Sequence, residues 1–149
     1  FAETLSAEWQ AYPDALVARG RVTRRDGGFR HCCLIKVNSP MNLIGTKLSR
    51  LADAMGFSPD QCILVFDDID YPIGKVKLRL NGSSGGHRGV ASVLEAFQTD
   101  KIRRIKIGVA DETAKTARSE MVLRKFTPEN IETIKPAVQL AAKRLAELI

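Results

Sequence analysis

A short apolar run, Cys62–Phe66 (CILVF), constrains the fold of this chain more than any other feature, and Asp67 and Asp68 follow it directly. Five apolar residues without alternation are typical of a strand that is buried on both faces of a sheet. Sheets of this kind have helices on both faces, so the run predicts an α/β fold. Ligand sites in such folds lie beyond the carboxyl ends of the strands, which is where we expect Asp67, Asp68 and Asp70.

The segments before this run predict a hairpin and a helix. Ala15–Val22 and Phe29–Val37 are rich in apolar residues and are separated by an Asp-Gly-Gly turn signal, so we expect two antiparallel strands. A helix should follow, with Ser39 as its N-cap and Gly56 just past its end. Phe1–Trp9 has the pattern of the last part of a helix.

The segments after the run continue the alternation of strands and helices. They are, in order, a strand with one basic face over 76–80, a helix over 87–97, a strand over 102–107 and a long helix that Thr127 caps. Pro136 lies inside the last helix and should kink or divide it. We therefore expect a single α/β domain over residues 1–149, with a mixed, mostly parallel, twisted sheet flanked by helices.

Composition excludes several classes of protein. The chain has 149 residues, of which 44% are hydrophobic, so it is long enough for one core and too apolar for a disordered segment. Its apolar runs are too short for a membrane span. Cys32, Cys33 and Cys62 form no CxxC motif, and we expect reduced core thiols in an intracellular protein. Two histidines are too few for a histidine-based metal site, so no metal is expected.

Charge is unevenly distributed along the chain. The formal net charge is +6, which favours a polyanionic partner only weakly. Basic residues concentrate between Lys75 and Lys106, whereas the segment from Asp60 to Asp70 holds aspartates and no basic residue. Such a pair of segments suits a hydrolase that binds phosphate groups, and two solvated faces of opposite charge are an equally good interpretation.

Two local patterns each have a chemical and a structural interpretation. Asp67 and its neighbours could orient a catalytic base, bind a metal ion or cap a turn, and for an isolated Asp-Asp pair we favour capping. The glycines of Gly82–Gly89 let backbone N–H groups approach an anion at the start of the next helix. This segment has neither the Lys-Ser/Thr of a P-loop nor GxGxxG spacing, so it predicts no ATP or NAD site and is explained more simply as a tight connection.

Taken in order, five stretches resemble the bacterial-type peptidyl-tRNA hydrolases. They are SPMNLIG, CILVFDDIDYPIGKVKLRL, NGSSGGHRGV, IRRIKIGV and VLRKF, and together they extend through nearly the whole chain. The resemblance implies an α/β domain that binds the acceptor end of tRNA. Members of this family hydrolyse the ester between a peptide and the terminal ribose of tRNA, without a metal or cofactor.

The resemblance also implies roles for individual residues. Asp67 stands at the aspartate that orients the catalytic histidine, and Asn42 stands at the asparagine that holds the peptidyl part. The family's GGHNG loop reads Gly85, Gly86, His87, Arg88 and Gly89 here, so Arg88 replaces an asparagine that contacts substrate. Among the basic residues, those expected to bind RNA phosphates are Lys75, Lys77, Arg79, Arg103 and Arg104.

The chain departs from the family pattern at its start. Family members open with a central strand, a GNPG turn and a segment that carries the catalytic histidine, and Phe1–Trp9 resembles the stretch immediately after that segment. His31 lies in an expected strand and His87 belongs to the glycine loop, so neither matches the catalytic base. We expect that another segment, or a protein partner, completes the sheet.

Two functions from different classes fit these features. One is a peptidyl-tRNA hydrolase whose histidine lies in a further segment. The other is an inactive relative that binds tRNA or structured RNA as a ribonucleoprotein component, for example of an organellar ribosome or a splicing complex, in a mitochondrion or another organelle if not in the cytoplasm. An assembly module without RNA fits the basic faces less well. No membrane partner is expected.

Overall fold

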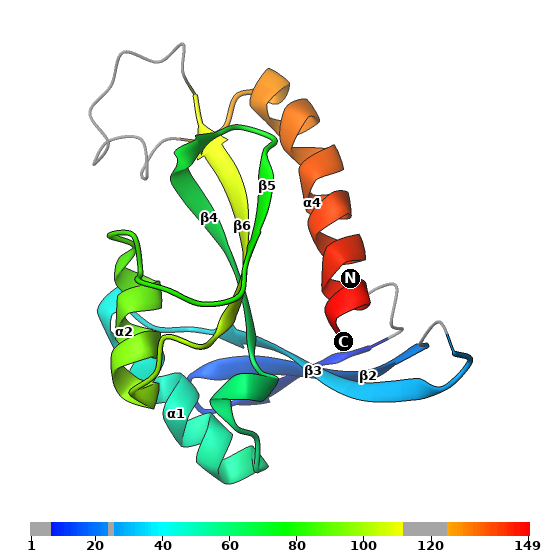
Figure 1. Cartoon of the computed structure of the whole chain (residues 1–149), viewed down its shortest axis with the longest axis vertical. Helices are drawn as coiled ribbons and strands as arrows, with labels where there is room; N and C mark the ends of the chain where they lie inside the picture. The colour runs from blue at the N-terminus through cyan, green and yellow to red at the C-terminus, as the bar shows by residue number, and fades with distance from the viewer. Residues whose placement is uncertain (1–6, 24–25, 112–124) are drawn as a thin grey trace. The chain divides into compact units, whose positions relative to one another are not determined.

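A computed structural model describes residues 7–23, 26–111 and 125–149. Its elements in chain order are β1 (Trp9–Tyr12), β2 (Ala15–Thr23), β3 (Phe29–Val37), η1 (Met41–Leu43), α1 (Ile44–Met55), η2 (Pro59–Gln61), β4 (Ile63–Pro72), β5 (Val76–Arg79), α2 (Arg88–Phe97), β6 (Arg103–Ala110) and α4 (Pro128–Leu148) (Figure 1). The chain forms two compact units. The first comprises Phe1–Gln61, Ser83–Asp100 and Ala146–Ile149, and the second comprises Cys62–Gly82 and Lys101–Leu145.

The first unit contains an antiparallel sheet in the order β1-β2-β3. The β2–β3 pairing extends from Ala15 opposite Val37 to Thr23 opposite Phe29, so the hairpin expected from the sequence is confirmed. Side chains of a strand alternate between the two faces of a sheet. Ala15 and Val17 therefore share a face, and they form a core cluster with Leu51 of α1.

Helices α1 and α2 make their closest approach at a glycine. A Cβ on Gly45 would overlap the backbone carbonyl of Ser92, so only glycine fits where the two helices meet. The Gly45 N–H donates to the Ser92 hydroxyl at 3.0 Å, and that hydroxyl donates to the Asn42 carbonyl at 2.9 Å. Gly56 ends α1 in the left-handed conformation, with φ of 70°, as its sequence position predicts.

The second unit contains the sheet β4-β6-β5. Strand β4 pairs with β6 in parallel, and β5 pairs with β6 in antiparallel orientation. The β4–β6 register shifts between Asp68 and Pro72. A Cβ on Gly108 would overlap the Pro72 carbonyl, so a glycine in β6 lets the irregular part of β4 approach closely.

The last helix begins with a reciprocal cap. The Asn130 N–H donates to the Thr127 hydroxyl at 3.2 Å, and the Thr127 N–H donates to the Asn130 side-chain oxygen at 3.1 Å. Helix α4 then continues through Pro136 without division. The cap expected at Thr127 is thus confirmed, and a division of the helix at Pro136 is not observed.

Several expectations about local structure are wrong. Strand β4 extends to Pro72, so Asp67, Asp68 and Asp70 lie inside a strand and not beyond its end, because β6 continues to pair with this segment. Ser39 does not cap α1, since η1 precedes that helix and no side chain caps it. Trp9 opens β1 and is not part of a helix, while residues 1–6 lie outside the described residues.

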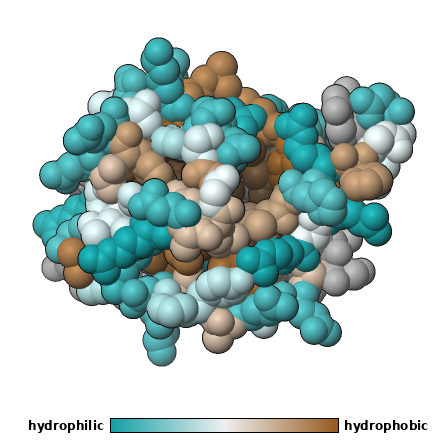
Figure 2. Space-filling view, turned by 90° about the horizontal axis from the view of Figure 1, so that it is seen from below, coloured by the Kyte–Doolittle hydropathy of each residue, from teal (hydrophilic) through white to brown (hydrophobic). Residues whose placement is uncertain are grey.

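The surface carries apolar side chains among charged ones. Figure 2 shows a face on which hydrophilic side chains predominate and hydrophobic ones lie between them. Among the residues that the structure describes, the most exposed large apolar side chains are those of Leu80 and Phe29, at 61% and 59%. In the described residues no helix is long and apolar enough to cross a membrane.

Candidate functional site

The glycine-rich loop leads directly into α2, and His87 is the N-cap of this helix. Gly85 and Gly86 have φ of 60° and 82°, values that residues with a Cβ rarely adopt. The Nδ1 atom of His87 accepts a hydrogen bond from the Val90 N–H at 3.2 Å. Through this bond the unprotonated Nδ1 atom of His87 satisfies a free N–H group at the start of the helix.

Arg88 and Asn42 lie in the same unit as this loop. Arg88 is the first residue of α2 and is exposed. Asn42 lies in η1, which contacts α2, and its backbone carbonyl is fixed by the Ser92 hydroxyl. Met41 approaches Gly89, since its Sδ atom would lie 3.3 Å from a Cβ at that position. The structure thus brings the Asn42 turn and the GGHRG loop together at the start of α2.

Asp67 belongs to the second unit, in the middle of β4. It lies opposite Ile107 of β6 and is exposed. Within the described residues its carboxylate has no hydrogen-bond or ion-pair partner. An exposed carboxylate without a partner in its own unit is available to hold a polar group brought to it.

Asp68 has the opposite environment from Asp67, because successive strand residues face opposite sides of the sheet. Its side chain is 8% exposed and accepts a hydrogen bond from Lys106 Nζ at 2.7 Å. Its other oxygen accepts the Asp70 N–H at 2.8 Å. Asp68 therefore stabilises the irregular end of β4, which is the turn-capping role considered for this aspartate pair.

Four cations surround one aromatic side chain on the Asp68 face of the sheet. The ammonium groups of Lys75, Lys77 and Lys106 lie 5.6, 4.8 and 5.6 Å from the ring centroid of Tyr71. Hydrogen bonding to Lys77 is the main cause that lowers the pKa of the Tyr71 phenol, and Arg79 contributes in the same direction. We call this group of residues, with Arg79 included, the Tyr71 cluster.

Three of the five residues predicted to bind phosphates belong to the Tyr71 cluster, namely Lys75, Lys77 and Arg79. The other two, Arg103 and Arg104, do not belong to it. Lys75 and Arg79 are exposed and Lys77 is half-buried. Arg103 and Arg104 are adjacent in β6 and so face opposite sides of the sheet. Arg104 is 1% exposed and donates to the Gly82 carbonyl, an environment that suits a structural role at the start of the glycine loop.

Tyr71 and Lys106 were not singled out from the sequence as site residues. Lys106 was counted in the basic segment, but its place opposite Lys77 depends on the pairing of β5 with β6. Tyr71 directly follows Asp70, and only the irregular end of β4 brings its ring to the lysines.

The three thiols differ in exposure. Cys32 and Cys62 are half-buried, whereas Cys33 is exposed, so the expectation of three core thiols is wrong for Cys33. Burial raises the pKa of the Cys32 thiol. No group of three or more metal-ligating side chains, cysteines included, occurs in the part of the chain that the structure describes.

Comparison with known proteins decides the family. The family model described as "Peptidyl-tRNA hydrolase" matches residues 1–149. This chain belongs to the peptidyl-tRNA hydrolase family. The family resemblance noted in the sequence is thereby confirmed.

Individual relatives agree with this assignment. The chain is 36% identical to a peptidyl-tRNA hydrolase of Aquifex aeolicus over 82% of this chain and 64% of that protein. It is 34% identical to that of Geobacillus kaustophilus, over 97% of this chain and 76% of that protein. Against the Aquifex aeolicus and Geobacillus thermodenitrificans relatives, the chain spans 64% and 59% of their length.

Solved structures agree on the fold. A crystal structure of peptidyl-tRNA hydrolase from Acinetobacter baumannii superposes with a TM-score of 0.81 at 19% identity, covering 99% of this chain and 74% of that one. The expected α/β class with a mixed sheet is therefore confirmed, and among the described strands parallel pairing occurs between β4 and β6.

Proposed function

We propose that this chain binds the tRNA part of peptidyl-tRNA and contributes Asp67 to hydrolysis of the ester between peptide and tRNA. The observation that carries the proposal is the Tyr71 cluster, which lies on one face of the β4-β6-β5 sheet. Asp67, on the same strand β4, is exposed on the opposite face. Lysine and arginine side chains neutralise backbone phosphates, and this contact dominates nucleic-acid affinity. The aromatic ring among the cations suits a nucleotide as well as a phosphate.

In the proposed reaction, a water molecule attacks the ester carbonyl and an imidazole removes its proton. Asp67 accepts a hydrogen bond from the other nitrogen of that imidazole, which fixes the tautomer and stabilises the imidazolium. The Asn42 side chain and the GGHRG loop bind the substrate on their own unit. No cofactor takes part in these steps.

The imidazole must come from outside the described residues. His87 uses Nδ1 to cap α2, and His31 belongs to β3. We propose that a further segment or a protein partner brings the histidine and pairs with the outer edge of β4, which is the end strand in the described order β4-β6-β5.

A second candidate is an inactive relative that retains RNA binding, as a ribonucleoprotein component in an organelle or elsewhere. Arg88 favours it, because a guanidinium replaces the small amide of the family's loop. An arginine at the first position of a helix can bind a phosphate, since the N-terminal amides also attract anions.

Release of an N-blocked amino acid from its tRNA by the purified chain tests the proposal, with imidazole added at millimolar concentration as a substitute for the missing base. We expect little turnover without imidazole, because a general base contributes about 10²–10⁴-fold. Added imidazole should restore turnover in wild type and much less in Asp67→Asn. Equal rescue of both proteins would remove Asp67 from the mechanism.

Binding of deacylated tRNA, measured in parallel, separates the two candidates. Binding with rescue by imidazole supports the hydrolase. Binding without any rescue supports the inactive relative. Absence of binding would contradict both.

A further inference from the structure

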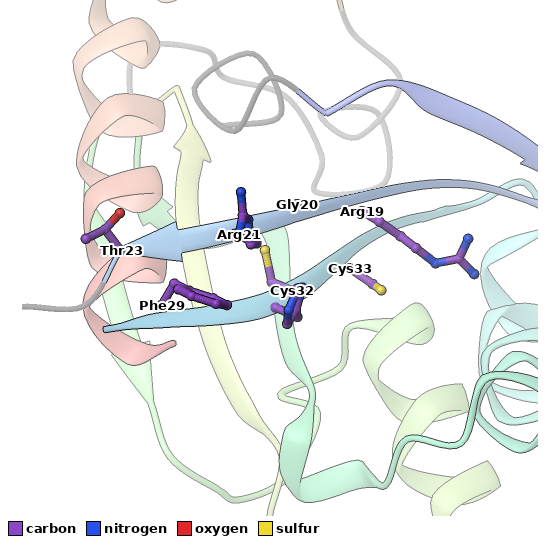
Figure 3. A pocket seen from close by; sticks show the side chains of 8 residues that line it. Arg19, Gly20, Arg21, Thr23, Phe29, Cys32 and Cys33 are labelled. Carbon is purple, nitrogen blue, oxygen red and sulfur yellow. The ribbon is translucent and has the colours of Figure 1, made fainter. Parts of the chain in front are cut away.

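The outer half of the β2–β3 hairpin carries a second surface that the proposed function does not use. Arg19 and Arg21 of β2 lie opposite Cys33 and His31 of β3, and Thr23 lies opposite Phe29. Directly opposed residues share a face. Figure 3 shows the Arg19 and Cys33 side chains projecting from the two neighbouring strands, with Phe29 nearer the end of the hairpin. An open hollow of about 660 Å³ lies along this face.

Both arginines are held in place by aromatic partners on the same sheet. Arg19 Nη2 donates to the Tyr12 hydroxyl at 2.6 Å, and its Cζ atom lies 5.5 Å from the Tyr12 ring centroid. Arg21 Cζ lies 5.0 Å from the ring centroid of Phe29. Both guanidinium groups are exposed. In the contacts that the structure describes, neither forms an ion pair with a carboxylate.

Phe29 gives this face an exposed aromatic platform. Its side chain is 59% exposed, and the His31 ring packs edge-on against it with centroids 5.6 Å apart. An exposed ring with a guanidinium over one face is the combination on which unpaired bases stack.

The charge of the hairpin complements a polyanion. Residues 19–31 contain Arg19, Arg21, Arg24, Arg25 and Arg30 against a single acidic residue, Asp26. This arginine content was not assigned a role from the sequence, because Arg19 and Arg21 belong to one strand and Arg30 to the other. Arginine is preferred to lysine where phosphate binding is combined with stacking.

We propose that Arg19, Arg21, Phe29 and His31, which we call the hairpin face, form a second RNA-binding surface. The two guanidinium groups bind backbone phosphates and Phe29 stacks an unpaired base. The inference rests on the proposed function in one respect, since it takes RNA as the partner. The hairpin face belongs to the first unit, and it binds RNA in addition to the Tyr71 cluster, which belongs to the second unit.

Fluorescence anisotropy with a labelled tRNA transcript, at salt concentrations from about 50 to 200 mM, tests the hairpin face. We expect Arg19→Ala/Arg21→Ala to weaken binding about tenfold or more and to reduce the slope of log K against log salt by about one to two. Phe29→Ala should weaken binding several-fold with little change in slope, because stacking releases no counterions. Phe29→Trp should retain the affinity.

Arg50→Ala/Arg144→Ala is the matched control, since it removes the same charge from two exposed helix positions. Arg19 also supports Tyr12, so Arg21→Ala and Arg21→Lys are measured alone, and the lysine variant should keep most of the salt dependence. If the hairpin variants bind no worse than the control, the hairpin face is not an RNA surface.

The binding measurements distinguish a failure of the hairpin face from a failure of the proposed function. Loss of binding in Lys77→Ala/Arg79→Ala, with none in the hairpin variants, would overturn the hairpin face and leave the proposed function standing. Wild-type chain that binds no tRNA at all would overturn both.

Discussion

Lys106 Nζ lies 2.7 Å from Asp68 Oδ2, and the two side chains are only 12% and 8% exposed. This ion pair joins the centre of β6 to the irregular end of β4 inside the second unit. Because Asp68 also accepts the Asp70 N–H, the pair fixes the segment that presents Tyr71 to the basic residues.

Asp68→Ala should therefore destabilise the protein, by about 2–4 kcal/mol, because it leaves the Lys106 ammonium largely buried without its partner. Urea denaturation monitored by circular dichroism measures the change. Lys106→Met should cost less, since a methionine of similar length leaves no unpaired cation. Equal stability of Asp68→Ala and wild type would show that the pair is not formed in solution.

Gly45→Ala should destabilise the protein by about 2 kcal/mol or more, because the added methyl group overlaps the Ser92 carbonyl and separates α1 from α2. The midpoint of thermal unfolding measures it. Gly28→Ala is the control, since a Cβ there meets only the flexible side chain of Asp26 and should change stability by about 0.5 kcal/mol or less. Similar losses in both variants would argue against a specific contact at Gly45.

Arg79 and Arg104 should respond differently to substitution, although both are arginines of the same sheet face. Arg79→Ala should leave stability unchanged and reduce the salt slope of tRNA binding by about one. Arg104→Ala should lower stability, because it removes a buried side chain that donates to the Gly82 carbonyl. Parallel titrations with tRNA and urea distinguish them, and an exchange of the two phenotypes would contradict this assignment.

The stabilisation that the Glu129 carboxylate gives the protein should be lost in acid. Hydrogen bonds from its own backbone N–H and from Thr127 lower the pKa of its carboxyl group below the ordinary value of 4.5. A carboxyl whose pKa is lower in the folded state stabilises the protein above pH 4.5, and this stabilisation is lost as the pH falls through the folded-state pKa. Melting temperatures between pH 3 and about 6 should fall less steeply in Glu129→Gln, and identical slopes would refute the prediction.

The two adjacent cysteines should differ in reactivity. Cys33 is exposed, while Cys32 is half-buried, and burial raises the pKa of the Cys32 thiol, which reduces its thiolate fraction near pH 8. Iodoacetamide should therefore label Cys33 first, as followed by peptide mass spectrometry. Preferential labelling of Cys32 would mean that the hairpin is oriented differently.

Much of the local structure follows from the sequence, because it depends on neighbours along the chain. Alternation of apolar residues and a turn signal place the β2–β3 hairpin, and Gly56 and Thr127 mark helix ends, since caps are formed within one or two turns. Ser39 failed as a cap because the chain makes a separate turn at Met41–Leu43 before α1 begins. The family motifs were equally readable, as they are contiguous.

The sequence by itself determined the α/β class, the family and the identity of the residues at the motif positions. Tertiary structure decided how these residues are used. Pairing with β6 extended β4 past the aspartates, which separated an exposed Asp67 from an ion-paired Asp68. The same pairing buried Arg104 and placed Lys106 of β6, Lys77 of β5 and Lys75 just before β5 around Tyr71. Such outcomes depend on which strand becomes the neighbour of another, and that is set by contacts between residues far apart in the chain.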